Sequence, residues 1–262
     1  MSGTNYSAPE PVQDQRADRA VKDWLAAPLA RAAVLQALAA AAVIALVTSG
    51  WQPLLRLDQD VAARLHALAL EHPGWTHAHR ILTDWVVDPW TMRLLLTVTV
   101  FGLWWQRRRL LALCLALTSI AETALRALLR WAIGRERPHW QDPVDTADFA
   151  ALPSGHAMTT AATCVLLLGL ARQIPLRPWL WHTARVAAIL IIAVACFTRI
   201  FLGVHWLTDT LAGVLLGSAL ATAAFATWHS LTGPDRAART AKPALPRQHR
   251  GQHREATSDT DN

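Results

Sequence analysis

The sequence predicts an all-α integral membrane protein: a six-helix bundle with a short amphipathic helix on its extracytoplasmic side. The composition indicates this class, because 53% of the 262 residues are hydrophobic and only 17% are charged, too few for the polar surface of a soluble fold. Many of the 13 tryptophans fall near the ends of apolar segments, where an amphipathic ring prefers to sit at the level of the lipid headgroups.

Six apolar segments account for the predicted spans, since a membrane-crossing helix needs about 20 apolar residues. They are residues 31–49, 90–105, 110–128, 156–172, 184–201 and 207–228. The first follows a polar stretch that is too long for a simple secretory signal peptide, which predicts an uncleaved span. We therefore expect one six-span domain over residues 30–230, with disordered cytoplasmic tails over 1–29 and over the basic segment 231–262.

The segment 51–88 does not have the pattern of a span. Asp58 and Asp60 precede apolar residues at helical spacing, and acidic residues are typical of the start of a helix. The sequence His72-Pro73-Gly74 then interrupts the pattern. We expect a short amphipathic helix that lies on the membrane surface, with a solvated loop as an equally compatible alternative.

Basic residues in the short loops predict the orientation, because such residues concentrate on the cytoplasmic side. Arginines within 107–109 and 172–185, together with the basic residues before the first span and after the last, fall on one face of a six-span arrangement. That face is therefore expected to be the cytoplasmic face of a bacterial cell membrane. The loops after the third and fifth spans would then face outward.

The sequence pI of about 10.2 does not indicate nucleic-acid binding, because the basic residues cluster at segment ends and in the tails rather than on one face. The basic tail after the last span is a candidate contact for anionic lipid. Cys114, Cys164 and Cys196 lie inside apolar segments, which favours buried thiols over disulfides or metal ligands. The oligomeric state stays open.

The first of three polar motifs is Arg130-x6-Arg137-Pro138. The two arginines are separated by nearly two helical turns, so they would point the same way if the helix continued to the proline. The alternative is that both arginines extend to the membrane interface. Glu122 and Arg126, four residues apart, are interpreted as an intrahelical ion pair hidden from lipid.

The second motif is Pro153-Ser154-Gly155-His156, at the start of the fourth predicted span. Serine is a good N-cap, and the free N–H groups and dipole of a helix start favour an anion. Gly155 would let the backbone approach a phosphate closely, and His156 could reach a leaving oxygen. The alternative is an ordinary capped helix with a histidine at the interface.

The third motif is Arg199-x5-His205-x3-Asp209, at the start of the sixth predicted span. A spacing of four residues places His205 and Asp209 on one helix face. A carboxylate that accepts one ring N–H fixes the tautomer and leaves the other nitrogen free as a nucleophile. Gly203 would allow the preceding turn. A lone interfacial histidine is the alternative, which the ordered occurrence of all three motifs disfavours.

These motifs resemble those of the type-2 phosphatidic acid phosphatase superfamily, which includes vanadium haloperoxidases and glucose-6-phosphatase. The family pattern is Lys-x6-Arg-Pro, then Pro-Ser-Gly-His, then Ser-Arg-x5-His-x3-Asp. The resemblance covers residues 130–209 by motif and about 30–230 by the layout of the spans. Arg130 stands at the position of the family's lysine and Thr198 at that of its serine. Both changes keep the chemical type, although a planar guanidinium and an ammonium are not interchangeable.

The resemblance implies roles for the motif residues. His205 would attack phosphorus and form a phosphohistidine, Asp209 would orient it, and His156 would protonate the leaving group and then activate water. The oxygens of the phosphoryl group would be held by Arg130, Arg137, Ser154, Gly155 and Arg199. Because guanidinium groups and a helix terminus would supply the positive charge, neither a metal ion nor another cofactor is expected.

The predicted function is hydrolysis of a membrane lipid phosphate or diphosphate at the outer face of the membrane. Candidate substrates are undecaprenyl diphosphate, phosphatidylglycerophosphate and phosphatidic acid. A lipid phosphotransferase with the same site stays open as an alternative. A vanadium haloperoxidase is disfavoured by the many spans, since those relatives are typically soluble. A non-enzymatic transporter would explain Glu122 and Arg126 but not the ordered motifs.

Overall fold

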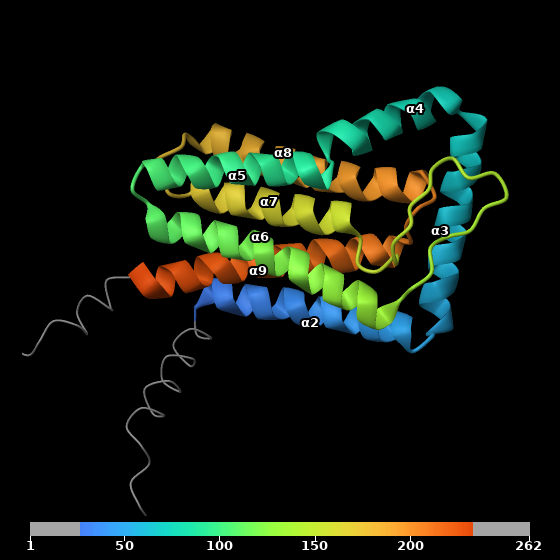
Figure 1. The fold of residues 1–262 in the computed structure, drawn as a ribbon, viewed down its shortest axis with the longest axis horizontal. Helices are drawn as coiled ribbons and strands as arrows, with labels where there is room; N and C mark the ends of the chain where they lie inside the picture. Colours follow the sequence, from blue (N-terminus) through green and yellow to red (C-terminus); the bar gives the residue numbers. More distant parts are fainter. Residues whose placement is uncertain (1–26, 233–262) are drawn as a thin grey trace, which may run out of the picture.

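The fold is a bundle of six long helices that lie side by side (Figure 1). The computed structural model describes residues 27–232. The bundle consists of α2 (Pro28–Thr48), α5 (Pro89–Trp105), α6 (Arg109–Ile133), α7 (Gly155–Ala171), α8 (Pro178–Phe201) and α9 (Leu207–Thr232). The two predicted tails, and the lipid contact expected of the basic one, lie almost entirely outside the described residues.

Five stretches of the described chain are long and apolar enough to cross a membrane. They are the helices α2, α6, α8 and α9 and the stretch Pro73–Trp105, which contains α5. The remaining bundle helix, α7, is apolar but shorter, with 17 residues. The prediction of an all-helical, multi-pass membrane protein is thereby confirmed. Helix α8 begins before the predicted residue 184, because Pro178 occupies its first turn, a position that proline favours.

The end of α6 differs from the prediction that Pro138 ends this helix. Helix α6 ends at Ile133, because Gly134 adopts a left-handed conformation with φ 59°, which glycine accepts at little steric cost. Arg130 therefore belongs to the last turn of α6, whereas Arg137 lies in the loop beyond it. The helix therefore does not continue to the proline, and the two arginines do not share a helix face.

Helix α7 lies within the bundle and packs most closely on α9. A Cβ at Gly213 would come within 2.8 Å of the Ser154 carbonyl oxygen, and one at Gly217 would overlap the carbonyl group of Met158. Small residues allow helix backbones in a membrane to approach this closely. The packing places the N-terminus of α7 beside the start of α9, where the Ser154 N–H donates to the Asp209 carbonyl oxygen at 3.0 Å.

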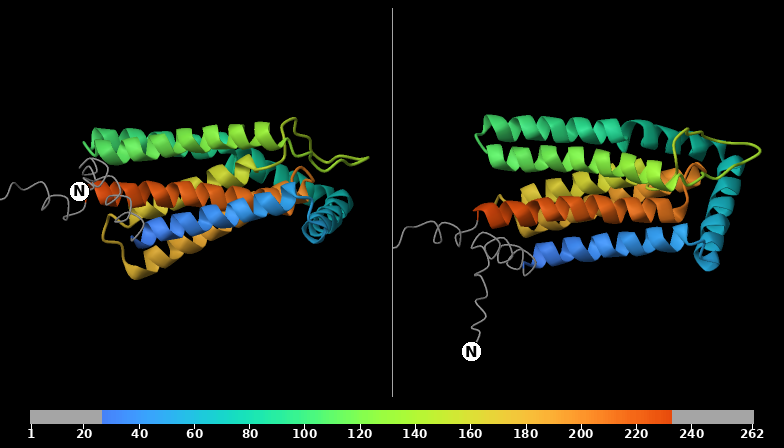
Figure 2. Two further views of the ribbon diagram at one scale, coloured as in Figure 1. Left: turned by 90° about the horizontal axis from the view of Figure 1, so that it is seen from below. Right: turned by 60° about the horizontal axis from the view of Figure 1, so that its bottom comes forward.

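One end of the bundle is crossed by helix α3 (Gln52–Glu71) (Figure 2). The short helix α4 (Pro73–Ile81) and the π-helix η1 (Leu82–Val86) then lead into α5. The loop 134–154 and the turn 202–206 lie at the same end, because each connects two bundle helices there. All three sequence motifs therefore meet beside α3.

The amphipathic helix predicted within residues 51–88 is present but is longer than expected, and the alternative of a solvated loop is wrong for residues 52–71. Asp58 and Asp60 lie well inside α3 rather than at its start. The reason is that α3 already begins at Gln52 with Pro53 in its first turn, a position that proline tolerates. Asp58 is buried, whereas Asp60 is exposed.

Candidate active site

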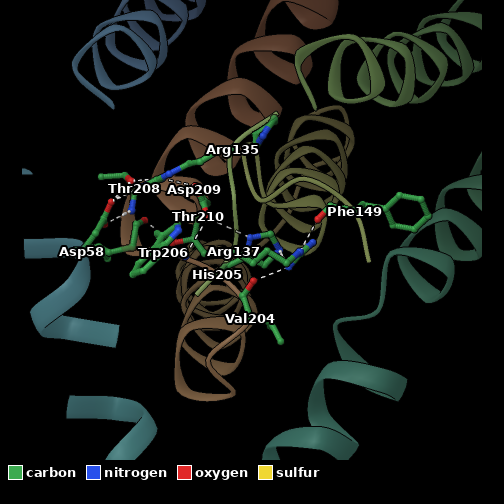
Figure 3. Close-up of polar contacts among 12 residues, drawn as sticks. Asp58, Arg135, Arg137, Phe149, Val204, His205, Trp206, Thr208, Asp209 and Thr210 are labelled. Atoms are coloured by element: carbon green, nitrogen blue, oxygen red, sulfur yellow. Dashed lines mark hydrogen bonds and ion pairs between the residues drawn. The ribbon is translucent and has the colours of Figure 1, made fainter. Parts of the chain in front are cut away.

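The candidate site combines side chains from three separate parts of the chain (Figure 3). The loop 134–154 contributes Arg137, the turn 202–206 contributes His205, and the first turn of α9 contributes Asp209. His205 is 1% exposed and Asp209 is 0% exposed. Such complete burial of an imidazole and a carboxylate requires that both be hydrogen-bonded or paired.

The pairing predicted between His205 and Asp209 is present. The His205 Nδ1 atom lies 3.4 Å from Asp209 Oδ2, and the same carboxylate oxygen accepts a hydrogen bond from the Trp206 backbone N–H at 2.9 Å. His205 lies in the turn just before α9, and the turn is made possible by Gly203 with φ 69°. The four-residue spacing therefore joins a residue of the turn to a residue in the first turn of α9, and the two do not lie on one continuous helix face.

Arg137 and Asp209 together favour one tautomer of His205, because each lies at a different ring nitrogen. The Arg137 Nη1 atom lies 3.2 Å from His205 Nε2, and a guanidinium can only donate. Nε2 is therefore the acceptor with the lone pair, and Nδ1 carries the hydrogen that faces Asp209. Two backbone carbonyl groups hold Arg137 in place: Nε donates to Phe149 and Nη1 to Val204, each at 2.5 Å.

The surroundings of His205 favour the neutral imidazole. Burial lowers the pKa of His205 well below its ordinary value, and the charges of Arg137, Arg199 and Arg130 lower it further. The pKa of Arg137 falls to about 10, through burial first and then through the charge of Arg199. At neutral pH the site therefore combines an uncharged imidazole with a charged guanidinium. An uncharged imidazole has the free lone pair that a nucleophile needs, and a guanidinium can bind an anionic phosphoryl group.

Ser154 occupies the N-cap position of α7, but its side chain does not cap the helix. Within the described part of the chain the buried Ser154 Oγ atom has no hydrogen-bond partner. The prediction of a side-chain cap is therefore wrong, because backbone bonds, including the one from Ser154 N–H to Asp209, hold this end instead. The hydroxyl and the first N–H groups of α7 remain available to an anion.

Two guanidinium groups approach the start of α7. A Cβ at Gly155 would come within 2.8 Å of Arg126 Nη1 and 3.4 Å of Arg130 Nη2, so only glycine fits there without displacing them. Arg130 Nε also donates to the Pro153 carbonyl oxygen at 3.2 Å. Arg130 is thereby placed at the helix start, as expected of a phosphate-binding residue.

The predicted ion pair between Glu122 and Arg126 is confirmed, with 3.8 Å between Arg126 Nη1 and Glu122 Oε1. Glu122 is 2% exposed and also accepts a hydrogen bond from Thr159 Oγ1 at 3.0 Å. Arg93 of α5, which sequence analysis did not single out, lies 4.0 Å from the same carboxylate. The pair therefore belongs to a polar cluster between α5, α6 and α7.

Arg199 and His156 lie on another side of the site. Arg199 is 6% exposed, and its Nη1 atom lies 3.4 Å from Thr83 Oγ1 and 3.5 Å from Asp145 Oδ2. Asp145, which lies in the loop 134–154, is therefore an ion-pair partner of Arg199. His156 is half-buried in the first turn of α7, near enough to Arg199 and His205 to interact with both electrostatically.

Arg135 and Asp58 are site residues that the sequence did not predict. Arg135 Nη1 lies 2.5 Å from Asp209 Oδ1, and Arg135 Nη2 lies 2.7 Å from Asp58 Oδ2. No local spacing connects these residues, because they belong to α3, the loop 134–154 and α9. Among the residues that the structure describes, no group of three His, Cys, Asp or Glu side chains could hold a metal ion.

A family resemblance covers the part of the chain that forms the site. Residues 109–232, which include all three motifs, match the PAP2 superfamily. This segment is therefore similar to PAP2 proteins. The site residues from the loop 134–154, α7 and α9 all lie within the matching segment, whereas α2, α3, α4 and α5 precede it.

Two curated proteins are similar to part of this chain. The glucose-6-phosphatase catalytic subunit 1 of Haplochromis nubilus is 25% identical over 147 residues, which are 47% of this chain and 42% of that protein. The undecaprenyl-diphosphatase of Sulfolobus acidocaldarius is 28% identical over 128 residues, 46% of this chain and 57% of that protein. The matches span only about half the length of these curated relatives.

A solved structure shares the fold. The transmembrane PAP2-type phosphatidylglycerolphosphate phosphatase from Bacillus subtilis superposes with a TM-score of 0.63 and 20% sequence identity. The superposition covers 77% of this chain and 98% of that chain. The bundle architecture of this protein is therefore that of a known transmembrane PAP2-type phosphatase.

Proposed function

We propose that this protein is a membrane phosphatase that hydrolyses a lipid phosphate or diphosphate through a phosphohistidine intermediate. The observation that carries the proposal is the position of the His205 ring between Asp209 and Arg137. Asp209 lies at Nδ1 and Arg137 donates to Nε2, so a lone pair on Nε2 lies among guanidinium groups that can hold a phosphoryl group. Phosphoryl transfer depends mainly on such positioning and charge stabilisation.

In the first step, His205 Nε2 attacks phosphorus while the bond from phosphorus to the leaving oxygen breaks. Arg137 exchanges its hydrogen bond to Nε2 for one to a phosphoryl oxygen, which frees the lone pair. Arg130 and Arg199 hold further oxygens, and His156 donates its proton to the leaving oxygen. The Nδ1–H group remains on the imidazole and keeps its hydrogen bond to Asp209.

In the second step, water hydrolyses the phosphohistidine. His156, now neutral, accepts a proton from the water as its oxygen attacks phosphorus. The bond from phosphorus to Nε2 breaks, phosphate leaves, and His205 returns to its neutral form. Three guanidinium groups stabilise the charge of the phosphoryl group in both steps. The proposed reaction therefore needs no divalent cation.

The substrate is proposed from the location of the site and from the relatives. The motifs meet at the end of a membrane bundle, beside the amphipathic helix α3, where a lipid headgroup is accessible from the bilayer. Relatives are named for undecaprenyl diphosphate, phosphatidylglycerolphosphate and glucose 6-phosphate, which supports a phosphate ester or anhydride. The positions of the basic loops support a site on the extracytoplasmic face of the cell membrane.

The proposal is tested by phosphate release from purified protein in lipid nanodiscs. The substrates are undecaprenyl diphosphate, phosphatidylglycerophosphate, phosphatidic acid and, as a water-soluble comparison, glucose 6-phosphate. We expect release from at least one lipid, abolished in His205→Ala and strongly reduced in Asp209→Asn. No release from any lipid would contradict the proposal. Turnover that required an added alcohol would instead identify a phosphotransferase.

We also expect turnover to survive chelation. The proposed phosphate pocket contains three arginines, and Asp209 already faces His205, so a divalent cation would be repelled. Activity in EDTA should match activity without it, and orthovanadate should inhibit, because it can adopt the five-coordinate geometry of the transferring group. Activity that disappeared with EDTA and returned with Mg2+ would contradict the arginine pocket. Asp145 and Asp148, two carboxylates of the loop 134–154, would then be the candidate metal ligands.

A further inference from the structure

We infer that Arg135 and Asp58 position the nucleophile, by tying Asp209 to the surface helix α3. The inference rests on the proposed function for its kinetic consequences, but its structural part can be tested without activity. Neither is one of the specified residues of the three motifs: Arg135 occupies one of the six unspecified positions of the first motif, and Asp58 lies in α3. Figure 3 shows Asp209 between Arg135 on one side and His205 on the other.

One guanidinium bridges two carboxylates. Arg135 Nη1 lies 2.5 Å from Asp209 Oδ1, and Arg135 Nη2 lies 2.7 Å from Asp58 Oδ2. Asp58 is 1% exposed and Asp209 is 0% exposed, so solvent screens neither charge well. Arginine suits this role because its planar group offers several donors in a fixed geometry. Arg135 is thereby engaged with carboxylates and, unlike Arg137, is not in contact with His205.

Asp58 also fixes the start of α9. Asp58 Oδ1 accepts from the Thr208 N–H at 3.0 Å, and Asp58 Oδ2 accepts from Thr208 Oγ1 at 2.5 Å. First-turn N–H groups have no partner within their own helix, so a carboxylate from α3 satisfies one here. Thr208 Oγ1 in turn accepts from Arg135 Nη1 at 2.7 Å. Asp209 directly follows Thr208 in the chain. The hydrogen bonds from α3 to Thr208 therefore also fix the position of the Asp209 carboxylate.

The consequence concerns the proton on His205. A neighbouring guanidinium favours the ionised form of a buried carboxylate, whereas burial alone favours the protonated form. If Arg135 lost its charge, Asp209 could take up a proton and donate to Nδ1 instead of accepting from it. The ring hydrogen would then move to Nε2, Arg137 would lose the acceptor that it has there, and the lone pair proposed to attack phosphorus would be lost.

Helix α3 has a second, independent contact with the turn that contains His205. The His66 ring of α3 stacks on Trp140 with 4.1 Å between ring centroids, and Trp140 Nε1 donates to the Gly203 carbonyl oxygen at 2.8 Å. Removing the charge of Asp58 therefore leaves α3 docked. The variant Asp58→Asn can test the ion pair itself and not merely the presence of the helix.

The test compares wild type with Arg135→Gln, Arg135→Lys and Asp58→Asn. The matched control is Asp60→Asn, which removes the same charge from an exposed position of the same helix. The first readout is the His205 tautomer in 15N-histidine-labelled protein in lipid, by nuclear magnetic resonance, with the resonance assigned by its absence in His205→Ala. We expect Nδ1–H in wild type and Asp60→Asn, and its loss in Arg135→Gln.

The second readout is the separation of kcat from KM on the preferred lipid. Arg135→Gln should reduce kcat by about 10- to 1000-fold, less than the ~10^4-fold loss when the carboxylate of a triad is itself neutralised. KM should change less than about threefold, because Arg135 does not hold substrate. Arg135→Lys should restore part of kcat, Asp58→Asn should show a smaller loss, and Asp60→Asn none.

Two results would overturn the inference. One is a His205 that keeps its Nδ1–H tautomer in folded Arg135→Gln. The other is an active wild type whose kcat is unchanged in Arg135→Gln, or falls only in proportion to a loss of folded protein. A wild type that releases no phosphate from any substrate would contradict the proposed function, while the tautomer measurement would still decide the positioning roles.

Discussion

At the scale of single residues, His205 meets two opposing requirements. A nucleophilic imidazole must be neutral, yet it must lie beside the positive charges that bind a phosphoryl group. Burial and the charges of Arg137, Arg199 and Arg130 lower the pKa of His205, so the same guanidinium groups that are proposed to bind the substrate also keep the proposed nucleophile unprotonated. Arg137 and Asp209, one at each ring nitrogen, together favour the tautomer with its hydrogen on Nδ1.

The first prediction at this scale concerns pH. In the proposed mechanism the imidazole attacks in its neutral form, which is populated above its pKa and lost as pH falls through it. Because that pKa is lowered, kcat/KM should persist below pH 6.5. Arg137→Gln removes the largest charge contribution, so the acidic limb should move to higher pH. Comparing the two proteins on one substrate cancels the ionisation of the substrate. An unmoved limb would contradict the electrostatic account of His205.

The second prediction concerns His156, which lies in the first turn of α7 near His205. A poor leaving group needs a proton in the transition state, whereas an activated aryl phosphate needs it much less. His156→Ala should therefore reduce kcat by about 10^2- to 10^4-fold on a lipid phosphate and far less on p-nitrophenyl phosphate. Equal losses on the two substrates would indicate that His156 binds the phosphate instead.

At the scale of elements, the contact between α7 and α9 brings two motifs together. The small residues Gly213 and Gly217 let α9 approach the backbone of α7. The hydrogen bond from Ser154 N–H to the Asp209 carbonyl then joins the two helix starts. The anion-binding end of one helix and the carboxylate of the other therefore depend on packing that extends several turns away from the site.

We predict that Gly217→Ala weakens both stability and activity. Its Cβ would overlap the Met158 carbonyl group, which is backbone and cannot rotate away, so overpacking should cost about 1–3 kcal/mol. Thermal denaturation in detergent and phosphate release measure the two effects. The control is Gly102→Ala in α5, where a Cβ meets nothing within 4 Å. A Gly217→Ala protein as stable as the control would contradict the close α7–α9 contact.

At the scale of the whole molecule, the polar site lies at one end of a bundle whose sides are apolar. Large side chains on the outer faces of different helices are exposed in the isolated chain, for example Leu35 at 67%, Leu94 at 65% and Ile189 at 63%. Lipid would cover such surfaces in a bilayer. The charged groups of the site thus gather at one end of the bundle, where the headgroup of the proposed lipid substrate would meet water.

The proposed orientation predicts the reactivity of cysteines placed at the two ends. Asp148→Cys, exposed in the loop 134–154, should react with a membrane-impermeant thiol reagent in intact cells. Gln106→Cys, exposed between α5 and α6 at the opposite end, should react only after permeabilisation. The parent chain reports the background from Cys114, Cys164 and Cys196. The reverse pattern would place the site on the cytoplasmic face.

Much of this arrangement could be predicted because its causes are local. The six apolar segments follow from composition along the chain. The helix ends at Pro178 and Gly134 also have local causes, in residues that fix or permit a backbone conformation, although the prediction placed these ends at residue 184 and at Pro138. The proximity of His205 and Asp209 follows from their separation of four residues. The ion pair between Glu122 and Arg126 has the same origin.

The tertiary structure alone decided which distant groups meet. Arg137 reaches His205 only because α6 ends early and the loop 134–154 returns across the site. Asp58 and Arg135 reach the site through the placement of α3 across the end of the bundle. Such contacts arise from the packing of helices that are far apart in sequence, and no periodicity along the chain records them. The local sequence therefore determines which polar side chains each helix end and loop carries. The packing of the helices determines which of these side chains meet, and through those contacts it determines their protonation and charge.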